Sequence, residues 1–169
     1  MNITIRRFTA EDAPAVAALI HRTLRVSNAR DYSPRDIEAL VQRHTPEYIA
    51  KRAGWTHFYV ACAEGGDIVG CGAIGPYWDS AEESCLFSIF VDPDWQRRSV
   101  GRRIIEALEA DVFFLRAKRV EIPASITACG FYRGLGYDYK DGVDAPDAEG
   151  LFRLEKRRDP RTGGQHAPV

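Results

Sequence analysis

Long apolar runs are missing from this chain of 169 residues. Its apolar stretches fall far short of the roughly 18 residues that a membrane-spanning helix needs, and the first residues, MNITIRRFTAED, lack the apolar core of a signal peptide. A large charge of one sign is missing too, because 23 Lys and Arg nearly balance 24 Asp and Glu, for a formal net charge of -1. We therefore expect a cytoplasmic protein without a membrane or nucleic-acid partner.

Paired cysteines are missing as well. The four cysteines are widely spaced, lie in apolar segments and form no C-x-x-C pair; they are Cys62, Cys71, Cys85 and Cys129. We interpret them as buried, reduced thiols that behave as small apolar residues, and we expect no metal site. A nucleophilic role stays open for Cys129, which lies on a predicted helix, although every histidine is remote from it in sequence.

The size and composition of the chain indicate one hydrophobic core. With 45% apolar and 28% charged residues, the chain is long enough for one domain and too short for two comfortable ones. We expect a single globular domain over residues 1–158. Residues 159–169 contain proline and glycine without apolar periodicity, and we expect them to form a disordered tail.

Apolar periodicity predicts strands and helices in a definite order. A strand at residues 3–6 is followed by two or three amphipathic helices, which begin at the capping residues Thr9, Ser33 and Thr45. HFYVACAEGGDIVGCGAI then predicts two strands joined by a tight turn at residues 65–67. CLFSIFV is apolar at nearly every position, which predicts a central strand covered on both faces and ending at Val91.

The second half of the chain continues the alternation. A helix from Val100 carries an apolar stripe that extends to Val112 and Leu115. A short strand, RVEIP, leads to a helix capped by Ser125 and closed by Gly136, and two strands follow at about residues 137–140 and 151–155. This order predicts an α/β fold (α+β) around one mixed sheet.

The loop QRRSVGR, at residues 96–102, is the clearest candidate for a binding site. A helix that begins after a buried strand presents unpaired amides and the positive end of its dipole, which together favour an anion. Gly101 lets the backbone come close to a ligand, and four arginines add positive charge: Arg97, Arg98, Arg102 and Arg103. The alternative is a solvated turn with its arginines on the exposed side of the helix.

Ser99 stands where a loop of this kind usually has its first glycine. The serine still offers its backbone amide, but a positive φ at this position would cost on the order of 1–2 kcal/mol. The loop also lacks the lysine and spacing of a nucleotide P-loop, and it is not G-x-G-x-x-G. Nucleoside triphosphates and dinucleotides are therefore disfavoured as ligands.

Two motifs resemble one family. LFSIFVDPDWQRRSVGRRIIEALEAD resembles the acetyl-CoA-binding motif of the GNAT N-acetyltransferase superfamily, whose loop follows Q/R-x-x-G-x-G/A: Gln96 fills the first position, Ser99 replaces the first glycine, and Gly101 fills the last. ITACGFYRGLGYDY resembles the family's second motif, in which a helix carrying F-Y leads into L-G-Y or L-G-F. The order of elements agrees from residue 3 to about residue 155.

The resemblance implies a GNAT-like single domain, with a mixed, mostly antiparallel central sheet flanked by helices. It implies an enzyme that transfers acetyl from acetyl-CoA to a primary amine by direct attack, with Tyr132 as the general acid that protonates the leaving thiolate. It also implies a set of residues that bind acetyl-CoA. They are Ile89, Phe90 and Val91 at the pantetheine arm, Gln96, Arg97, Arg98, Ser99, Val100, Gly101 and Arg102 at the pyrophosphate, and Ser125, where many members carry an asparagine.

The acceptor side is less defined by the sequence. Asp31 and Tyr32 fall where the family usually walls its acceptor pocket, Glu83 lies at the entrance of the central strand, and Trp78 and Asp79 are further candidates. The resemblance implies a small-molecule or peptide amine as substrate and, since members commonly dimerise, a possible homodimer. Two alternatives stay open: a domain that binds acyl-CoA without turnover, and a thioesterase that uses Cys129 or a serine.

Overall fold

The computed structural model describes residues 2–159. They form two compact units: the first contains the residues up to Ala73 together with Ser88–Leu108, and the second contains Ile74–Phe87 and the residues from Glu109 onward. The single domain expected over residues 1–158 stays a prediction. The expected tail lies outside the described residues, apart from Asp159. Within residues 2–159, no helix is both long enough and apolar enough to cross a membrane.

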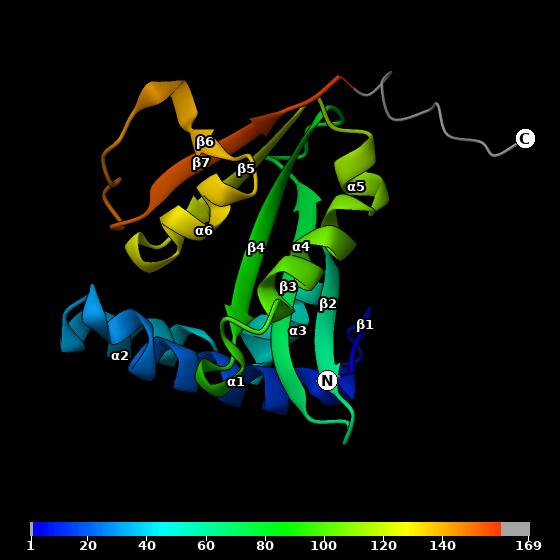
Figure 1. Cartoon of the computed structure of the whole chain (residues 1–169), viewed down its shortest axis with the longest axis vertical. Coiled ribbons are helices and arrows are strands. Elements are labelled where there is room, and N and C mark those ends of the chain that lie inside the picture. The colour runs from blue at the N-terminus through cyan, green and yellow to red at the C-terminus, as the bar shows by residue number, and fades with distance from the viewer. Residues whose placement is uncertain (1, 160–169) are drawn as a thin grey trace, which may run out of the picture. The chain divides into compact units, whose positions relative to one another are not determined.

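The first unit is built from its own strands and helices (Figure 1). Figure 1 shows α4 in front of β3 and α3 behind it. In chain order the elements are β1 (Ile3–Arg7), η1 (Ala10–Asp12), α1 (Ala13–Val26), η2 (Asn28–Arg30), α2 (Pro34–Arg43), α3 (Pro46–Ala53), β2 (His57–Ala63), most of β3 (Ile68–Pro76), the second half of β4 (Glu83–Val91), η3 (Pro93–Trp95) and nearly all of α4 (Val100–Glu109).

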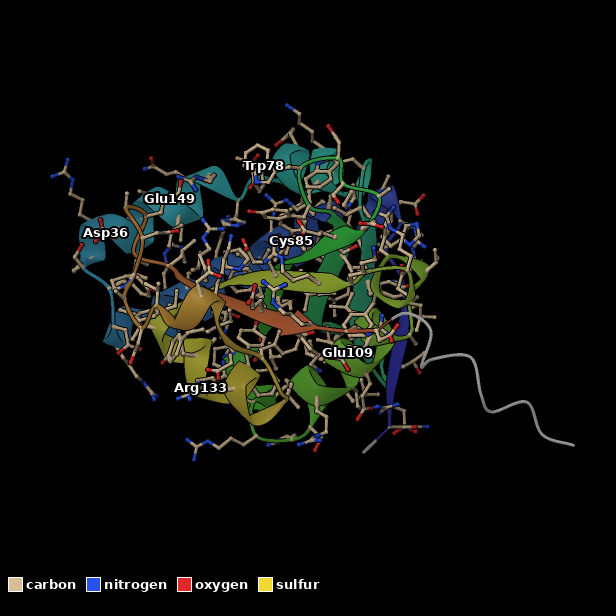
Figure 2. All side chains as sticks on the ribbon, turned by 90° about the horizontal axis from the view of Figure 1, so that it is seen from above. Asp36, Trp78, Cys85, Glu109, Arg133 and Glu149 are labelled. Atoms are coloured by element: carbon tan, nitrogen blue, oxygen red, sulfur yellow. The ribbon has the colours of Figure 1, made fainter. Side chains whose placement is uncertain are left out.

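The second unit begins with the end of β3 and the first half of β4. Its further elements are α5 (Val112–Leu115), β5 (Arg119–Ala124), η4 (Ile126–Ala128), α6 (Cys129–Gly134), β6 (Asp138–Tyr139), η5 (Lys140–Gly142) and β7 (Phe152–Arg157). Figure 2 shows Cys85 among the packed side chains and Trp78 at the rim, in agreement with exposed fractions of 3% and 87%.

The seven strands have the order β1-β2-β3-β4-β5-β7-β6. β1 pairs with β2, β5 with β7, and β6 with β7 in the antiparallel direction, whereas β4 and β5 are parallel. The expectation of a mixed, mostly antiparallel sheet is therefore confirmed.

β4 differs in its two halves. Its parallel register with β5 joins Glu83–Cys85 to Arg119–Glu121, yet the strand continues to Val91. Ser84, Cys85 and Leu86 are buried, but residues 87–91 are half-buried. The expectation of a strand covered on both faces is therefore correct only for the first half of β4. Apolar composition alone does not indicate where the neighbouring strand stops pairing.

Capping and turn residues act where the sequence places them. The Ser33 hydroxyl accepts a hydrogen bond from the Asp36 amide at 3.1 Å, and the Thr45 hydroxyl accepts one from the Tyr48 amide at 3.1 Å. These bonds satisfy amides that have no partner inside their helix. The turn between β2 and β3 uses Gly66 at φ 91°, and Gly136 adopts φ 94° after α6, as expected of glycine in these places.

The helix predicted from Val100 is wrong at its end. α4 stops at Glu109, and a separate α5 begins after Asp111, whose carboxylate accepts a hydrogen bond from the Phe113 amide at 2.9 Å. Val112 is 60% and Leu115 48% exposed, so neither extends the buried stripe of α4. An aspartate that caps a new helix has overridden the apolar periodicity.

The cap predicted at Ser125 is also wrong. The segment starts as the 3-10 turn η4, and the α-helical part begins only at Cys129. The Ser125 side chain makes no capping bond. Its backbone carbonyl instead accepts from the Ala128 amide at 3.0 Å, the shorter spacing of a 3-10 turn.

Two glycines of β3 allow α4 to lie close to the strand. A Cβ at Gly70 would come within 2.8 Å of the Ile104 side chain, and a Cβ at Gly72 within 2.7 Å of the same side chain and 3.1 Å of Leu108. The two distances to Ile104 are shorter than any normal contact, and the distance to Leu108 is tighter than most. The helix is therefore in direct contact with the backbone of β3, and its first turn is placed by that contact.

We expect Gly72→Ala to destabilise the protein by about 1–3 kcal/mol, because the added methyl group must displace buried helix side chains. Urea unfolding measures this loss. Gly65→Ala is the matched control, since a Cβ at Gly65 has nothing within 4 Å. Equal unfolding midpoints for the two variants would show that α4 does not depend on this close approach.

Candidate functional site

The loop after β4 is fastened at its start by Gln96. The Gln96 side-chain amide donates to the Val91 carbonyl at 3.1 Å and to the Ser27 hydroxyl at 2.9 Å. The first position of the motif therefore holds the loop to the end of β4 and the end of α1. Its expected contribution to binding comes through this positioning of the loop.

The backbone of the loop turns into the left-handed region twice, at Arg97 (φ 58°) and at Ser99 (φ 63°). Left-handed residues in a turn favour an arrangement in which successive amides face one concavity, and a concavity of this kind binds anions. The sequence signal for Ser99 was thus informative: the position does adopt the positive φ that glycine would adopt without strain.

α4 adds its own amides to this concavity. Its first turn is marked by the Arg103 amide, which donates to the Ser99 carbonyl at 3.0 Å. The amides of Val100, Gly101 and Arg102 precede that bond, so no carbonyl one turn earlier is available to them. With the positive end of the helix dipole, they favour a negatively charged group at this place.

The side chains around the loop leave it positively charged. Arg97, Arg98, Arg102 and Arg103 are exposed, and the guanidinium of Arg98 lies 5.6 Å from the centre of the Trp95 ring. The carboxylates of Asp92 and Asp94 form ion pairs with Arg22. Arg22 offsets one of these two negative charges, so the four arginines of the loop still dominate the local field.

The second half of β4 contains a kink that sequence reasoning missed. Ser88 has φ 52° inside the strand, its hydroxyl lies 3.4 Å from the donating Arg52 guanidinium, and its carbonyl accepts from the Cys71 thiol at 3.2 Å. The sequence feature that could have indicated this kink is Ser88 itself, a polar residue within the apolar run CLFSIFV. The kink separates the buried first half of β4 from the half-buried residues Ile89–Val91.

In the second unit, Tyr132 is a buried residue of α6 with 4% of its surface exposed. Its ring lies 5.2 Å from that of Phe131 and 6.3 Å from that of Tyr137. The Tyr137 hydroxyl donates to Glu109 at 3.0 Å, and burial together with this carboxylate raises the pKa of Tyr137 far above its usual range. The phenol of Tyr137, next to Tyr132, therefore stays protonated.

Glu83 is engaged within the second unit. The Arg119 guanidinium donates to its carboxylate at 2.9 Å, and this hydrogen bond lowers the pKa of Glu83. The same guanidinium pairs with the buried Glu121 at 2.9 Å and with Glu155 at 3.1 Å. A carboxylate held in this way is a weak base.

Cys129 is poorly suited to nucleophilic attack. It is buried, its thiol donates to the Ser125 carbonyl at 3.4 Å, and burial raises the pKa of the thiol. A protonated thiol is not a nucleophile. All four cysteines are buried and free, and in the part of the chain that the structure describes no group of three or more His, Cys, Asp or Glu residues is placed to hold a metal ion.

The remaining candidates belong to different parts of the molecule. Asp31 and Tyr32 follow η2 in the first unit, where the Asp31 amide donates to the Asn28 carbonyl at 3.0 Å. Trp78 and Asp79 are consecutive left-handed residues of the second unit, with φ 45° and 60°. The structure brings residues 89–91 and 96–102 together in the first unit, whereas Glu83, Ser125 and Tyr132 belong to the second.

Comparison with known proteins agrees with this geometry. Residues 22–137 match the Acetyltransferase (GNAT) family. The chain is 26% identical over 139 residues, 80% of this chain and 81% of the relative, to the uncharacterized N-acetyltransferase YafP of Escherichia coli (strain K12).

Two solved structures share the fold. The PaiA N-acetyltransferase from Thermoplasma acidophilum, crystallised in complex with coenzyme A, aligns with a TM-score of 0.78 and 17% identity, covering 94% of this chain and all (100%) of that one. The ribosomal-protein-S18-alanine N-acetyltransferase from Escherichia coli aligns with a TM-score of 0.62 and 20% identity, covering 91% of each chain.

We expect Ser99→Gly to stabilise the protein by up to about 1 kcal/mol. Relief of the left-handed strain exceeds the extra freedom that glycine gives the unfolded chain. Chemical denaturation in urea reports the difference. Ser125→Gly is the control, because Ser125 has φ −65° and gains no relief of strain; if Ser99→Gly lowers stability as the control does, the loop is not strained at this residue.

Proposed function

The chain belongs to the Acetyltransferase (GNAT) family, and on that premise we propose that it transfers acetyl from acetyl-CoA to a primary amine. The observation that carries this proposal is the pair of left-handed residues Arg97 and Ser99, which lie directly before the first amides of α4. A diphosphate fits the donors of this loop, because several backbone amides and exposed guanidinium groups converge there. We propose that residues 96–102 hold the pyrophosphate of coenzyme A.

The second half of β4 supports the place of the pantetheine arm. Ile89, Phe90 and Val91 are half-buried and lie beyond the register that β4 shares with β5. A strand with free amides and carbonyls accepts an extended ligand as it would accept another strand. Since the pyrophosphate loop follows Val91, the arm extends back along β4, and its thioester end comes to the region of the Ser88 kink.

Acetyl-CoA supplies an activated acetyl thioester. The chain holds it so that an amine nitrogen can attack the thioester carbonyl carbon, after which the carbon–sulfur bond breaks and the electron pair leaves on sulfur. We assign to Tyr132 the role of donating its phenolic proton to that sulfur, as a phenol and a thiolate of similar basicity exchange a proton readily. The matching position of Tyr132 in GFYRGLGY and its place on α6 support this role.

The proposed acceptor is a small-molecule or peptide amine. The nearly neutral net charge of -1 favours no particular acceptor class, and a shared fold does not identify a substrate. The name of one similar enzyme states a ribosomal-protein alanine as its acceptor, so the proposal includes peptide amines. Asp31, Tyr32 and Glu83 are proposed to contact the acceptor, Ser125 to contact coenzyme A, and the homodimer stays a prediction.

A domain that binds acyl-CoA without turnover is the second candidate. Two observations favour it: Ser99 in the strained position of a glycine, and the pairing of Glu83 with Arg119, which weakens that carboxylate as a base. A thioesterase that uses Cys129 is disfavoured by the raised pKa of its buried thiol.

We expect the intact protein to bind acetyl-CoA and coenzyme A with micromolar affinity, and Gly101→Asp to abolish this binding. The substitution places a carboxylate where the pyrophosphate is proposed to lie. Isothermal titration calorimetry measures both proteins. Gly65→Asp adds the same charge at the β2–β3 turn and serves as the control; absence of binding by the intact protein would contradict both acyl-CoA functions.

Removal of the Tyr132 hydroxyl is expected to lower kcat by about 10²–10⁴-fold, the usual contribution of a general acid. Tyr132→Phe keeps the buried ring, so the affinity for coenzyme A should not change. Thiol release with a panel of primary amines measures kcat, and Tyr139→Phe is the matched control. Unchanged turnover in Tyr132→Phe would remove the acid role, and absence of turnover in every protein would favour the binding domain.

A further inference from the structure

The proposed reaction leaves one proton unassigned. An amine is mostly protonated at neutral pH, and its nitrogen attacks only after that proton has left. Glu83 is a poor candidate to take it, because Arg119 holds its carboxylate and lowers its pKa. His44, in the first unit, is another candidate, because its imidazole ring contacts that of Phe90 in the second half of β4.

His44 is held by two hydrogen bonds at the end of α2. Its ring Nδ1 donates to the Leu40 carbonyl at 2.7 Å, and its backbone carbonyl accepts from Nε2 of His21 at 2.8 Å. The bond from Nδ1 fixes the tautomer of the ring. In the neutral imidazole, the lone pair is therefore on Nε2.

Nε2 of His44 is available to a ligand. His44 is 9% exposed, and among residues 2–159 none forms a hydrogen bond with this nitrogen. Among residues 2–159, the side-chain nitrogen or oxygen atom that is both buried and without a hydrogen-bond partner is Nε of Arg116. Since Nε2 of His44 has no partner and is not such a buried atom, it keeps some contact with solvent. An acceptor in such a place gains from a donor that a bound molecule brings.

The ring lies beside the strand that is proposed to hold the acyl donor. Its centre is 5.8 Å from that of the Phe90 ring, which it meets edge-on at 77°. The same ring also meets that of Tyr48, at 5.3 Å and 72°. Phe90 stands between Ile89 and Val91, so His44 borders the path proposed for the pantetheine arm.

Arg52 brings a positive charge to the same end of that path. Its guanidinium donates to the Tyr48 hydroxyl at 2.6 Å and lies 3.4 Å from the Ser88 hydroxyl at the kink of β4. A fixed positive charge here opposes the protonated form of an incoming amine. His44 and Arg52 are thus joined through Tyr48 on the side of β4 where the thioester end is proposed to lie.

The surroundings of His44 keep its ring neutral. Burial is the main cause that lowers its pKa below the ordinary value, and electrostatic repulsion from Arg52, Arg43 and His21 lowers it further, against the opposing effect of the Leu40 carbonyl. Tyr48 and Phe90 face the ring with aromatic edges. A neutral imidazole with a free lone pair is a proton acceptor at physiological pH.

We propose that Nε2 of His44 is the general base that takes a proton from the acceptor ammonium, directly or through one water molecule. This inference rests on the proposed acetyl transfer. The ammonium loses one proton to Nε2 and becomes a nucleophilic amine, and His44 becomes an imidazolium. After the carbon–nitrogen bond has formed and the carbon–sulfur bond has broken, the tetrahedral nitrogen releases its second proton to solvent, and the imidazolium does the same. Tyr132, which has protonated the sulfur, regains a proton from solvent.

His44→Asn tests the role, since asparagine retains a side-chain N–H that can bond the Leu40 carbonyl but has no basic nitrogen. Two small acceptors serve as probes: n-propylamine, with an alkylamine pKa of about 10, and glycinamide, with an α-amino pKa of about 8. We expect kcat/KM for n-propylamine to fall about 10²–10⁴-fold. The loss for glycinamide should be smaller by about tenfold or more, because a larger share of it is already neutral.

The pH profile provides a second readout. In the intact protein, kcat/KM should fall as the pH drops through the lowered pKa of His44, because the protonated ring cannot accept a proton. In His44→Asn the limb at the pKa of His44 should disappear, and kcat/KM should instead rise with pH up to the pKa of the amine, in proportion to its neutral fraction. His21→Gln retains the hydrogen bond to the His44 carbonyl and is the control. It should keep the acid limb, shifted slightly to higher pH, because His21 is one of the groups that lower the pKa of His44.

Equal losses for both amines in His44→Asn, or a limb that is retained at the pKa of His44, would show that His44 only caps α2 and would overturn the proposal. A ¹⁵N titration of the ring by NMR is independent of turnover. A neutral Nδ1–H ring whose Nε2 resonance shifts when n-propylamine is added supports the proposal, and a cationic ring or an Nε2–H tautomer at about pH 7 overturns it. Failure of the intact protein to bind acetyl-CoA would instead overturn the proposed function itself.

Discussion

The close contact between α4 and β3 is the constraint on which the candidate site depends. Gly70 and Gly72 leave no side chain between the strand and Ile104, so the helix axis lies near the sheet, and its first turn follows directly on the end of β4. The Gln96 amide then fixes the short connection to Val91 and Ser27. An anion site made of backbone amides needs such rigidity, because its donors are useful only if their directions are set before the ligand arrives.

Strain and charge are concentrated in the same loop. Arg97 and Ser99 both adopt left-handed backbone conformations, although a side chain at such a position costs on the order of 1–2 kcal/mol. The structure retains these conformations at the place where exposed arginines gather and where Arg22 pairs with the nearby acids Asp92 and Asp94. Strain that the surrounding structure maintains is often found at binding sites. The loop is therefore arranged for an anion, even with serine in the place of glycine.

Carboxylates elsewhere are used for internal pairing. Glu121 is 1% exposed and pairs with Arg119 at 2.9 Å and Lys140 at 2.8 Å, while Glu83 and Glu155 complete the partners of Arg119. A buried charge needs such partners, since an isolated one is strongly destabilising. Proton transfer during the proposed reaction then requires groups that are not already paired. His44, whose Nε2 has no bonded partner in the described part of the chain, meets this requirement in the first unit.

The sequence by itself determined the order of elements, the caps at Ser33 and Thr45, the turn at Gly66 and the loop at residues 96–102, because each follows from local periodicity, capping or backbone freedom. It did not determine where α4 ends, since Asp111 competed with the apolar stripe. Nor did it indicate His44 or the kink at Ser88. Only the tertiary structure decided these, because the ring of His44 meets Phe90 across 46 positions of sequence, and the properties of such a residue depend on neighbours that no local pattern specifies.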